Sequence, residues 1–374
     1  MKLSIEKNEL LKPLSRVQAV IEKRNSMPIL ANVLLHAKIE NDRQILQFSA
    51  TDLEVGIRSL QTVEVEKPGS LTVGAKKFFE IVRELPEEKV LLQSTSNSYL
   101  DIRCGRSHFT LAGTAAEEYP ALPEFSPERT ASLPAEILSG MIERTMYAAS
   151  ADETRYNLNG VYFEVREEEG KLRMVATDGH RLAMVDRAAP GDIEGLKGGV
   201  IIPRKGLSEL KRLLDEEDTS EVELAFEGNN GFARKGDVVL VMRLIEGEFP
   251  NYQQVIPKEP GTHLVLDTER LAKSLRRVVL LSSERSKAVK LEISEGEAVV
   301  TSNNPDLGDA RDEIDIDYAG ENLSIGFNAK YVLEALGSLH AKEIRLGLHG
   351  DLSPATLVPT NDEEALAVVM PMRI

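Results

Sequence analysis

Three residues with the side chains of acid–base chemistry lie close together in ATDGHRLA, residues 176–183. Asp178, His180 and Arg181 could supply a carboxylate, a general base and a cation to a hydrolase or a transferase. The same short polar segment, set between two apolar runs, could equally be a turn that carries a binding surface. The spacing alone leaves the catalytic and the binding interpretation open.

The segment around Asp178 belongs to a pattern that occurs three times. FSATDLEVGIR around Asp52, MVATDGHRLAM around Asp178 and VVTSNNPDLGDAR around Asn304 each read as two strands joined by a turn, at intervals of 126 residues. The first copy has the aspartate but no histidine. The aspartate is therefore predicted to form the turn and not to catalyse, whereas Gly179-His180-Arg181-Leu182 is specific to the second copy.

Each copy of the pattern is accompanied by segments with helical spacing of apolar residues. The predicted helices cover residues 8–24, 76–85, 135–149, 204–214, 268–278 and 329–342. Proline-rich joints at 117–130 and 248–262 separate the copies. The sequence therefore predicts an α+β protein of three tandem domains, residues 1–125, 126–260 and 261–374.

The charge is divided unevenly between these helices and the rest of the chain. The 374 residues have a formal net charge of −16, which by itself argues against a nucleic-acid-binding protein. The six helical segments, however, contain 18 Lys and Arg against 9 Asp and Glu, and the remainder contains 27 against 52. A shared basic surface would attract phosphates without reading bases. Because no basic stretch is interleaved with aromatic residues, double-stranded DNA is the expected ligand.

Several other classes of function find no support in the sequence. No apolar run approaches the ~18 residues of a membrane span, and the start MKLSIEKNEL does not read as a signal peptide. The single cysteine, Cys104, is expected to be a structural thiol in a reducing cytoplasm. DEIDIDY, residues 312–318, alternates like a strand with one acidic face, and no histidines have metal-ligand spacing. We expect no metal, no cofactor and no catalysis.

Matching stretches along the whole chain resemble the bacterial sliding clamps, the beta subunits of the replicative DNA polymerase III. They are LLKPL, MPILANVLL, KKFFEIVRELP, YNLNGVYFE, TDGHRLA, PRKGLSELKRLL, FPNYQQVIP, FNAKYVLEAL and the C-terminal VVMPMRI. The resemblance implies three tandem repeats of the DNA clamp fold and a head-to-tail homodimeric ring around duplex DNA. Helices would line the inside of the ring and antiparallel sheets would form its outside. The implied role is a non-catalytic processivity factor.

The resemblance also implies three sets of site residues. The DNA-binding set is Arg24, Lys76, Asp152, Tyr156, Asn157, Arg204 and Lys205. A partner-peptide pocket between the second and third domains is implied at Leu158, Thr177, Gly179, His180, Arg181, Leu182, Pro250, Val255, Asn328, Tyr331, Val368, Val369, Met370, Pro371, Met372 and Arg373. The ring seam would join Phe109 and Leu111 of one subunit to Leu280 and Leu281 of another. We expect the C-terminal VVMPM to be exposed, with a strand closing the third domain as the alternative.

The partners that the resemblance implies are duplex DNA without sequence preference and a second copy of the chain. Short linear motifs would bring the polymerase alpha subunit, the clamp-loader delta subunit, translesion polymerases, mismatch-repair proteins and ligase. Asp152 and Asn157 depart from the glutamine and tyrosine expected there, and Asp152 would repel phosphate. Gln254, Ser286 and Pro354 also depart from the family pattern around the pocket.

Overall fold

The computed structural model describes residues 1–21, 27–125, 130–189, 193, 196, 198–216, 220–258 and 261–373. The chain forms two compact units. Unit 1 comprises residues 1–136, 192–196 and 205–244, and unit 2 comprises residues 137–191, 197–204 and 245–374. The middle third of the sequence is shared between the units, so it does not separate as a compact body of its own.

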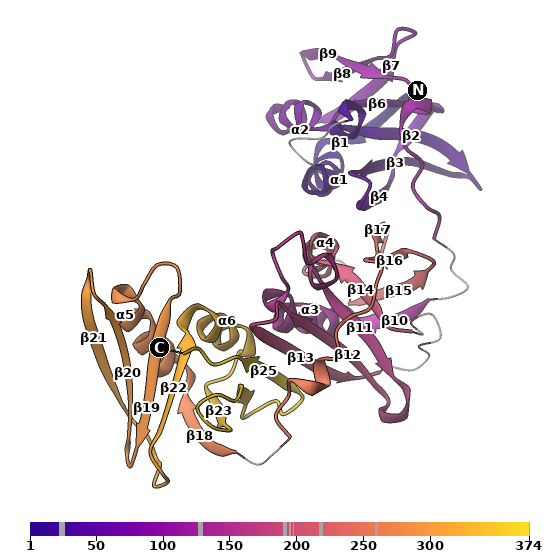
Figure 1. The fold of residues 1–374 in the computed structure, drawn as a ribbon. Coiled ribbons are helices and arrows are strands. Elements are labelled where there is room, and N and C mark those ends of the chain that lie inside the picture. Colours follow the sequence, from indigo (N-terminus) through magenta and orange to yellow (C-terminus); the bar gives the residue numbers. More distant parts are fainter. Residues whose placement is uncertain are drawn as a thin grey trace. The chain divides into compact units, whose positions relative to one another are not determined.

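In the described part of unit 1, thirteen antiparallel strands form one sheet in the order β10-β15-β16-β17-β4-β3-β2-β6-β9-β8-β7-β1-β5. Figure 1 labels most of these strands. The strands are β1 (Lys2–Glu6), β2 (Asn32–Glu40), β3 (Arg43–Thr51), β4 (Val55–Thr62), β5 (Glu64–Lys67), β6 (Gly69–Gly74), β7 (Lys89–Ser94), β8 (Tyr99–Cys104), β9 (Ser107–Thr114), β10 (Ala131–Pro134), β15 (Glu221–Glu227), β16 (Asn230–Lys235) and β17 (Val238–Arg243). Helices α1 (Lys7–Val20), α2 (Ala75–Glu84) and nearly all of α4 (Arg204–Leu214) belong to this unit.

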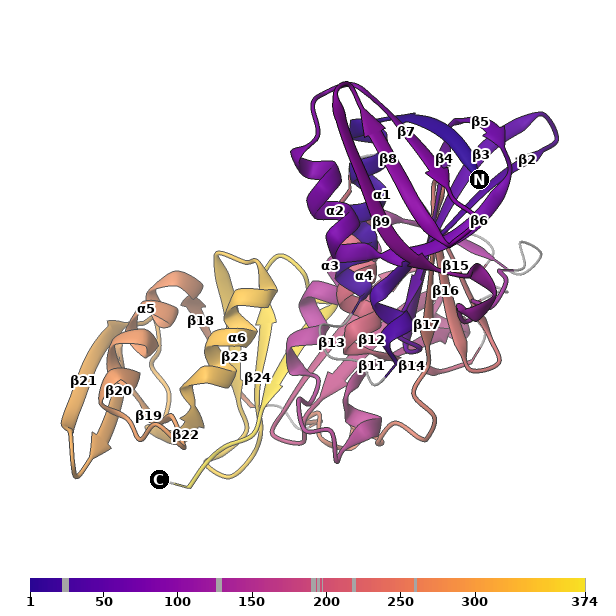
Figure 2. The same ribbon diagram turned by 90° about the horizontal axis from the view of Figure 1, so that it is seen from above.

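The helices of unit 1 fold because each buries one apolar stripe and exposes a charged one. In α2 the buried residues Ala75, Phe78 and Val82 follow helical spacing, and Lys76 and Lys77 point to solvent. Helix α1 lies beside α2 and packs against β3 and β4 (Figure 2). The apolar sides of the helices therefore face the sheet, and the basic side chains of α2 stay outside the core, whereas Lys7 and Arg16 of α1 are buried.

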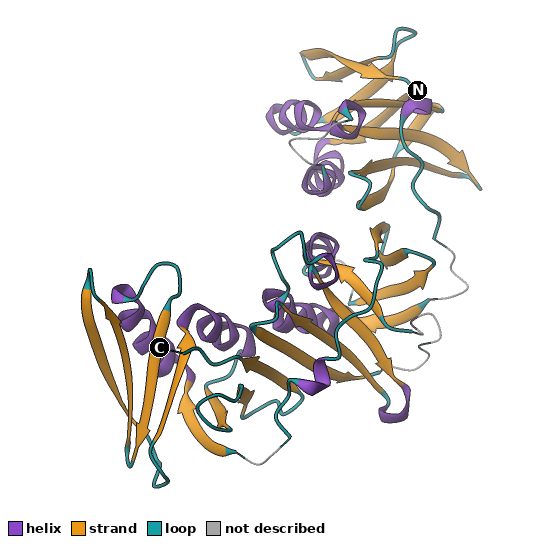
Figure 3. Cartoon of the chain, in the orientation of Figure 1, coloured by secondary structure: helices purple, strands orange, loops and turns teal. Residues whose placement is uncertain are grey.

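In the described part of unit 2, eight strands form a sheet in the order β14-β11-β12-β13-β25-β24-β23-β18, and four form a second sheet, β21-β20-β19-β22. Figure 3 shows the strands in orange and the helices in purple. The strands are β11 (Gly160–Arg166), β12 (Lys171–Thr177), β13 (Arg181–Ala188), β14 (Val200–Pro203), β18 (Thr262–Asp267), β19 (Ala288–Ser294), β20 (Glu297–Asn304), β21 (Gly308–Asp315), β22 (Leu323–Asn328), β23 (Glu343–Leu348), β24 (Ala355–Pro359) and β25 (Ala365–Val369). Helices α5 (Thr268–Val278) and α6 (Ala329–Leu339) pack against each other, and most of α3 (Ala135–Thr145) also belongs here.

All six predicted helices are present; the one predicted at 76–85 ends one position early, at Glu84, and three others end well before the predicted boundary. The helix predicted at 8–24 stops at Val20, because Ile21 has extended backbone angles. The one predicted at 135–149 gives way after Thr145 to a 3-10 turn. The one predicted at 329–342 ends where His340 takes a left-handed conformation, with φ of +48°. Apolar periodicity continues past these points, but the backbone turns away.

Two strand ladders give the sequence repeat its structural form. In unit 1, β17 pairs with β4 so that Met242 lies opposite Val55. In unit 2, β25 pairs with β13 so that Val369 lies opposite Arg181. The two members of each pair are separated in the sequence by nearly the same number of residues in both units. The middle third of the chain thus contributes a strand ladder to each compact unit.

Three smaller predictions can be compared directly with the fold. The alternating sequence VLLQSTSNSYLDIR predicts a hairpin, and the antiparallel pair β7–β8 confirms it. In DEIDIDY, Ile314 is buried and Glu313 and Asp315 are exposed, although the strand ends at Asp315. Cys104 is buried, and burial raises the pKa of its thiol, which makes it a poor nucleophile. No helix in the described ranges is both long and apolar enough to cross a membrane.

Candidate functional site

The polar segment that contains Asp178 is a tight turn between β12 and β13. Asp178 Oδ1 accepts hydrogen bonds from the backbone N–H groups of His180 at 2.9 Å and Arg181 at 3.1 Å. Thr177 Oγ1 donates to the carbonyl of Arg181 at 2.6 Å and accepts from the N–H of Gly179 at 3.1 Å. Gly179 has φ of +86°, a conformation that glycine adopts without strain.

Unit 1 contains the same turn without the histidine. Asp52 Oδ1 accepts from the N–H groups of Glu54 at 2.9 Å and Val55 at 2.7 Å. Thr51 Oγ1 donates to the carbonyl of Val55 at 2.9 Å and accepts from the N–H of Leu53 at 2.9 Å. The prediction that the repeated aspartate forms the turn is confirmed.

The catalytic interpretation of Asp178 and His180 is wrong. One oxygen of the Asp178 carboxylate caps the turn, and the other accepts from Arg181 Nε at 3.1 Å. The bond to His180 comes from its backbone N–H, and its imidazole instead stacks on Tyr331, with ring centroids 6.2 Å apart. An acid that holds a turn and a ring that faces an aromatic do not form a proton-transfer pair.

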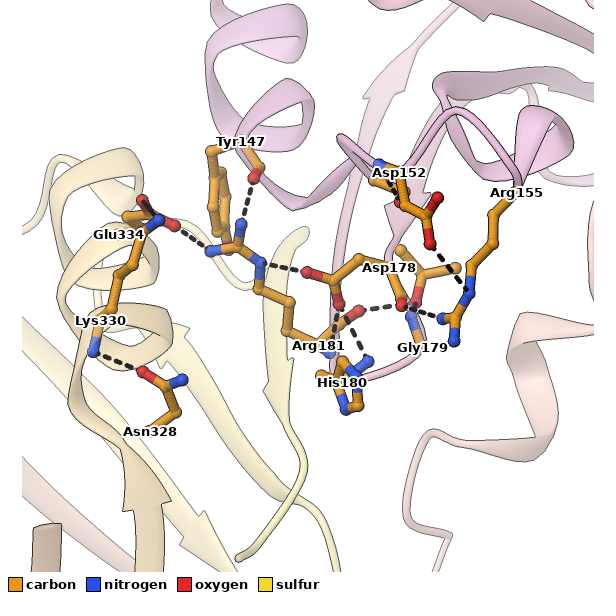
Figure 4. Close-up of polar contacts among 12 residues, drawn as sticks. Tyr147, Asp152, Arg155, Asp178, Gly179, His180, Arg181, Asn328, Lys330 and Glu334 are labelled. Atoms are coloured by element: carbon orange, nitrogen blue, oxygen red, sulfur yellow. Dashed lines mark hydrogen bonds and ion pairs between the residues drawn. The ribbon is translucent and has the colours of Figure 1, made fainter. Parts of the chain in front are cut away.

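Arg181 joins the turn to helix α6 and to the segment after α3 (Figure 4). Its guanidinium donates to Asp178, to Glu334 and, at 2.6 Å, to the carbonyl of Tyr147. It also lies over the rings of Tyr147, at 5.2 Å, and Tyr331, at 4.7 Å. The side chain is only 9% exposed. Arg181 is therefore a positioning residue, which fixes the turn so that His180 is presented beside Tyr331.

The surroundings of Arg181 are largely shielded from water. Burial raises the pKa of Tyr147 to about 12, although a hydrogen bond from Ser338 and the charge of Arg181 act in the opposite direction. Burial also raises the pKa of Tyr331. Both phenols remain neutral at physiological pH, and Tyr331 offers His180 an uncharged aromatic face.

A cavity of about 730 Å³ opens beside this arrangement. Its walls include His180, Arg181 and Tyr331 from the predicted peptide pocket, and Asp152 and Arg204 from the predicted DNA set. The sequence reasoning did not assign Glu143, Tyr147, Arg155, Lys330, Glu334 or Ser338, which also line it. Of these, Lys330 and Glu334 carry a detectable signal, because they lie four residues apart on a predicted helix. Nothing in the sequence around Tyr147 distinguishes it from a core residue.

An apolar cluster lies under the strands that carry the turn. Leu182 and Val368 face each other across β13 and β25 and pack with Val175 and Tyr252. Val368 and Val369 are each only 1% exposed. The expectation that VVMPM is exposed is therefore wrong for its two valines, which belong to β25. Successive side chains of a strand point to opposite faces of the sheet, and both faces are covered here. Val368 packs in this cluster, and Val369 lies with Leu271 and Leu275 of α5.

The remaining residues of the predicted pocket are partly buried or exposed. Met370 N–H donates to the carbonyl of His180 at 2.9 Å, and Met372 N–H to that of Gly326 at 2.8 Å, so the C-terminal segment is bonded to the turn before β13 and to β22. The partly buried members are Leu158, Thr177, Asn328, Met370, Pro371 and Met372, and the exposed ones are Gly179, Pro250, Val255 and Arg373. Gln254 is exposed, and Ser286 and Pro354 are partly buried.

Comparison with known proteins identifies the chain. Sequence models of the DNA polymerase III beta subunit match its N-terminal domain at residues 1–123, its central domain at 132–251 and its C-terminal domain at 253–373. The chain belongs to this family. Relatives named beta sliding clamp from Caulobacter vibrioides and Escherichia coli are 38% and 36% identical over the whole of both chains.

Solved structures give the same answer for the fold. Clamps from Bartonella birtlesii and Pseudomonas aeruginosa match with TM-scores of 0.94 and 0.93, at 38% and 35% identity, each over 100% of both chains. The predicted family and the three-domain clamp fold are confirmed. Like its relatives, the chain is a DNA sliding clamp, a processivity factor and not an enzyme.

The residues predicted to bind DNA in this clamp differ in how exposed they are and in which groups they already contact. Tyr156 is 61% exposed and the Lys76 side chain is 80% exposed. Arg204 donates to the carbonyl of Ser150, and Asn157 to that of Glu248. Lys205 ion-pairs with the buried carboxylate of Asp52. The exposed carboxyl of Asp152 accepts hydrogen bonds from the N–H and the hydroxyl of Thr154, which lower the pKa of that carboxyl. Arg24 lies outside the described residues.

Several basic helix residues of the clamp are partly neutralised by acids nearby. Arg270 pairs with Asp315 at 2.6 Å, and Arg277 donates to Asp312, which holds the pKa of both carboxyl groups below their usual values. Such pairs reduce the field that the helices exert on a phosphate. Helices with such ion pairs are suited to contacts with phosphate that are weak and easily exchanged.

The residues predicted for the ring seam of the clamp are not ordinary core residues. Leu280 is 74% exposed and Phe109 40% exposed, whereas Leu111 and Leu281 are partly buried. Strand β9, which carries Phe109, pairs with β8 along its length but with β6 only at Gly113 and Thr114. Strand β21 is the outermost strand of its sheet. Unpaired strand edges beside exposed apolar residues are a typical association surface.

Within the described residues, no three His, Cys, Asp or Glu side chains gather as a metal site would require.

Proposed function

We propose that this clamp acts as a closed ring of two head-to-tail copies that surrounds duplex DNA. The edges of β9 and β21 and the exposed side chains of Phe109 and Leu280 support this assembly. Its three domains are residues 1–125, 126–260 and 261–374. The ring holds DNA through sequence-independent contacts, which include Lys76, Tyr156, Arg204 and Lys205. Because a closed ring is retained by topology, these contacts need not be strong.

The site around His180 is proposed to bind short linear segments of partner proteins. The observation that carries this proposal is the buried Arg181, which fixes His180 and Tyr331 at the edge of a cavity of about 730 Å³. Met370, whose N–H donates to the carbonyl of His180, adds an adaptable apolar side chain to this site. Clamps from Pseudomonas aeruginosa and Bartonella birtlesii have been solved bound to griselimycin, and one from Caulobacter crescentus with polyethylene glycol in a putative tethering region.

The proposed partners are those that connect a clamp to replication and repair. They are the polymerase alpha subunit, the clamp-loader delta subunit, translesion polymerases, mismatch-repair proteins and ligase, which would share one pocket in turn. Asp152 disfavours phosphate near Arg155 and Tyr156, so this part of the DNA path is proposed to make weaker contacts than Lys76. The clamp would work in the cytoplasm, on the DNA of the nucleoid.

Replacing His180 by alanine is expected to weaken binding of a polymerase alpha-subunit tail peptide about tenfold, because the imidazole that faces Tyr331 is lost. Fluorescence anisotropy with a labelled peptide measures the effect. His36→Ala, at an exposed position of β2, is the matched control and should leave binding unchanged. Equal affinities for the two variants would contradict the proposed pocket. Loading onto circular DNA should persist in both variants at saturating clamp loader, although His180→Ala should need more loader, because the delta subunit is proposed to bind the same pocket.

A further inference from the structure

A second recess, of about 370 Å³, lies in unit 1 beside the turn that contains Asp52. It is lined by the turn itself, by Leu122 and Pro123 of the proline-rich joint, and by the segments around Asn230 and Arg243. None of its residues belongs to the DNA, peptide or seam sets described above. The recess is therefore a separate feature that the proposed function does not use.

The backbone around this recess repeats that of the peptide pocket. The two turns share the four hydrogen bonds made by their Thr-Asp pairs. A fifth is also shared: Arg243 N–H donates to the carbonyl of Glu54 at 2.8 Å, as Met370 N–H does to His180. By these bonds Glu54 takes the place of His180, and Arg243 takes the place of Met370. The recess has the framework of the pocket with different side chains on it.

The apolar floor is repeated as well. Val241 lies opposite Gly56 on β17 and β4, as Val368 lies opposite Leu182 on β25 and β13. Val241 is buried with Phe232 and packs against Phe125. Gly56 has no side chain, and a Cβ there would lie 2.4 Å from Leu122 Cδ2. Leu122 of the joint therefore occupies the place that Leu182 fills in the other copy.

Leu53, at the rim of the recess, has a strained backbone conformation. It has φ of +80°, at the position where the other turn has Gly179, and its side chain is 52% exposed. A leucine rarely adopts this conformation, and a leucine that is half exposed gains only part of the free energy of burial that would offset the strain. Strained backbone of this kind concentrates at binding sites. Leu53 adds an apolar contact at the rim of the recess.

The charges at the rim indicate the chemistry of an occupant. Arg243 and Glu54 both line the recess and are exposed, and among the described residues neither side chain makes an ion pair or a hydrogen bond. Arg243 can bind a carboxylate in a bidentate manner, while Glu54 excludes a second acid beside it. The pocket around His180 has no such pair in the equivalent positions.

We propose that this recess is a second peptide-binding site, which takes a short extended segment of a partner protein with one acidic residue between apolar ones. The acidic side chain binds Arg243, and an apolar neighbour packs on Leu53, Leu122 and Val241. The inference builds on the proposed function of the His180 pocket, whose framework it shares. The two sites select different peptides because a histidine and a methionine are replaced by a glutamate and an arginine.

The test uses the full chain with ¹³C-labelled Leu, Val and Met methyl groups, titrated with the peptide Ac-Ala-Leu-Asp-Leu-Ala-NH₂. Methyl resonances of Leu53, Leu122 and Val241 are expected to shift with a dissociation constant on the order of 1 mM. Arg243→Glu should weaken this binding about tenfold, the loss expected for one charge-assisted hydrogen bond. Arg43→Glu, at another exposed arginine of unit 1, is the matched control and should change nothing.

A peptide with lysine in place of aspartate reverses the expected order, binding Arg243→Glu better than the unchanged chain. The proposal is overturned when the three methyl groups do not shift, or when Arg243→Glu and Arg43→Glu weaken binding equally. Titration with the polymerase-tail peptide separates the two sites, because that peptide should shift Met370 and Met372 and leave Leu53 unchanged. If the tail peptide shifts Met370 and Met372 while the acidic peptide does not shift Leu53, the His180 pocket stands and the second site is removed. If only the acidic peptide causes shifts, at Leu53, the second site stands and the His180 pocket is removed.

Discussion

Arg181→Ala is expected to lower the free energy of unfolding of unit 2 by about 3 to 5 kcal/mol, the cost of breaking a buried ion pair by removing one partner. The substitution leaves Asp178 Oδ2 and Glu334 without their guanidinium and removes the donor to the Tyr147 carbonyl. It also removes the cation between the rings of Tyr147 and Tyr331. Urea denaturation followed by tyrosine fluorescence measures the change.

Arg155→Ala is the control for this result. Arg155 also bonds to the turn, donating to the carbonyl of Asp178 at 3.0 Å, but its side chain is 50% exposed. Solvent replaces such a contact, so a loss of less than about 1 kcal/mol is expected. If both variants lost the same stability, Arg181 would be one surface contact among several, and its role in presenting His180 would be refuted.

Leu280→Glu is expected to convert the dimer into monomers at micromolar concentration. A carboxylate at the seam meets apolar side chains and loses its hydration, which costs about 2 kcal/mol at each seam. A two-subunit ring has two seams, so the dissociation constant should rise about a thousandfold. Sedimentation equilibrium gives the mass directly.

The matched control for the seam is Leu352→Glu. Leu352 is 62% exposed, compared with 74% for Leu280, and both lie in unit 2. A general effect of new negative charge would appear in both variants. A dimer that survived Leu280→Glu, or one that Leu352→Glu disrupted equally, would rule out the proposed seam.

The sequence predicted most of the fold because its repeat could be read three times. Helical periodicity located all six helices, and the missing histidine beside Asp52 correctly reduced Asp178 to a turn former. Helix ends were predicted less well, since Ile21 and His340 leave the helix through backbone angles that no apolar pattern records. The three-domain prediction did not anticipate that the middle third would be divided between two compact units. Its strand β17 pairs with β4 in unit 1, and its strand β13 pairs with β25 in unit 2.

The site was predicted less completely than the fold. The resemblance pointed to His180 and Tyr331, which the structure places face to face. It gave no role to Tyr147 or Glu334, because their importance comes from contacts with Arg181 across a long sequence separation. Exposure of Val368 and Val369 was predicted wrongly, since a chain end rich in valine also fits a central strand. Such pairings depend on tertiary contacts that local patterns do not contain.

Retention on DNA is the most direct test of the proposed ring. Protein loaded onto nicked circular DNA should remain bound at about 1 M salt, where a Debye length of about 3 Å screens contacts with phosphate. Cutting the circle once with a restriction enzyme should release the protein within the time of sliding to an end. Gel filtration before and after cutting measures the bound fraction. Retention that falls steeply with salt on the circle, and is the same before and after cutting, would contradict encirclement of the duplex.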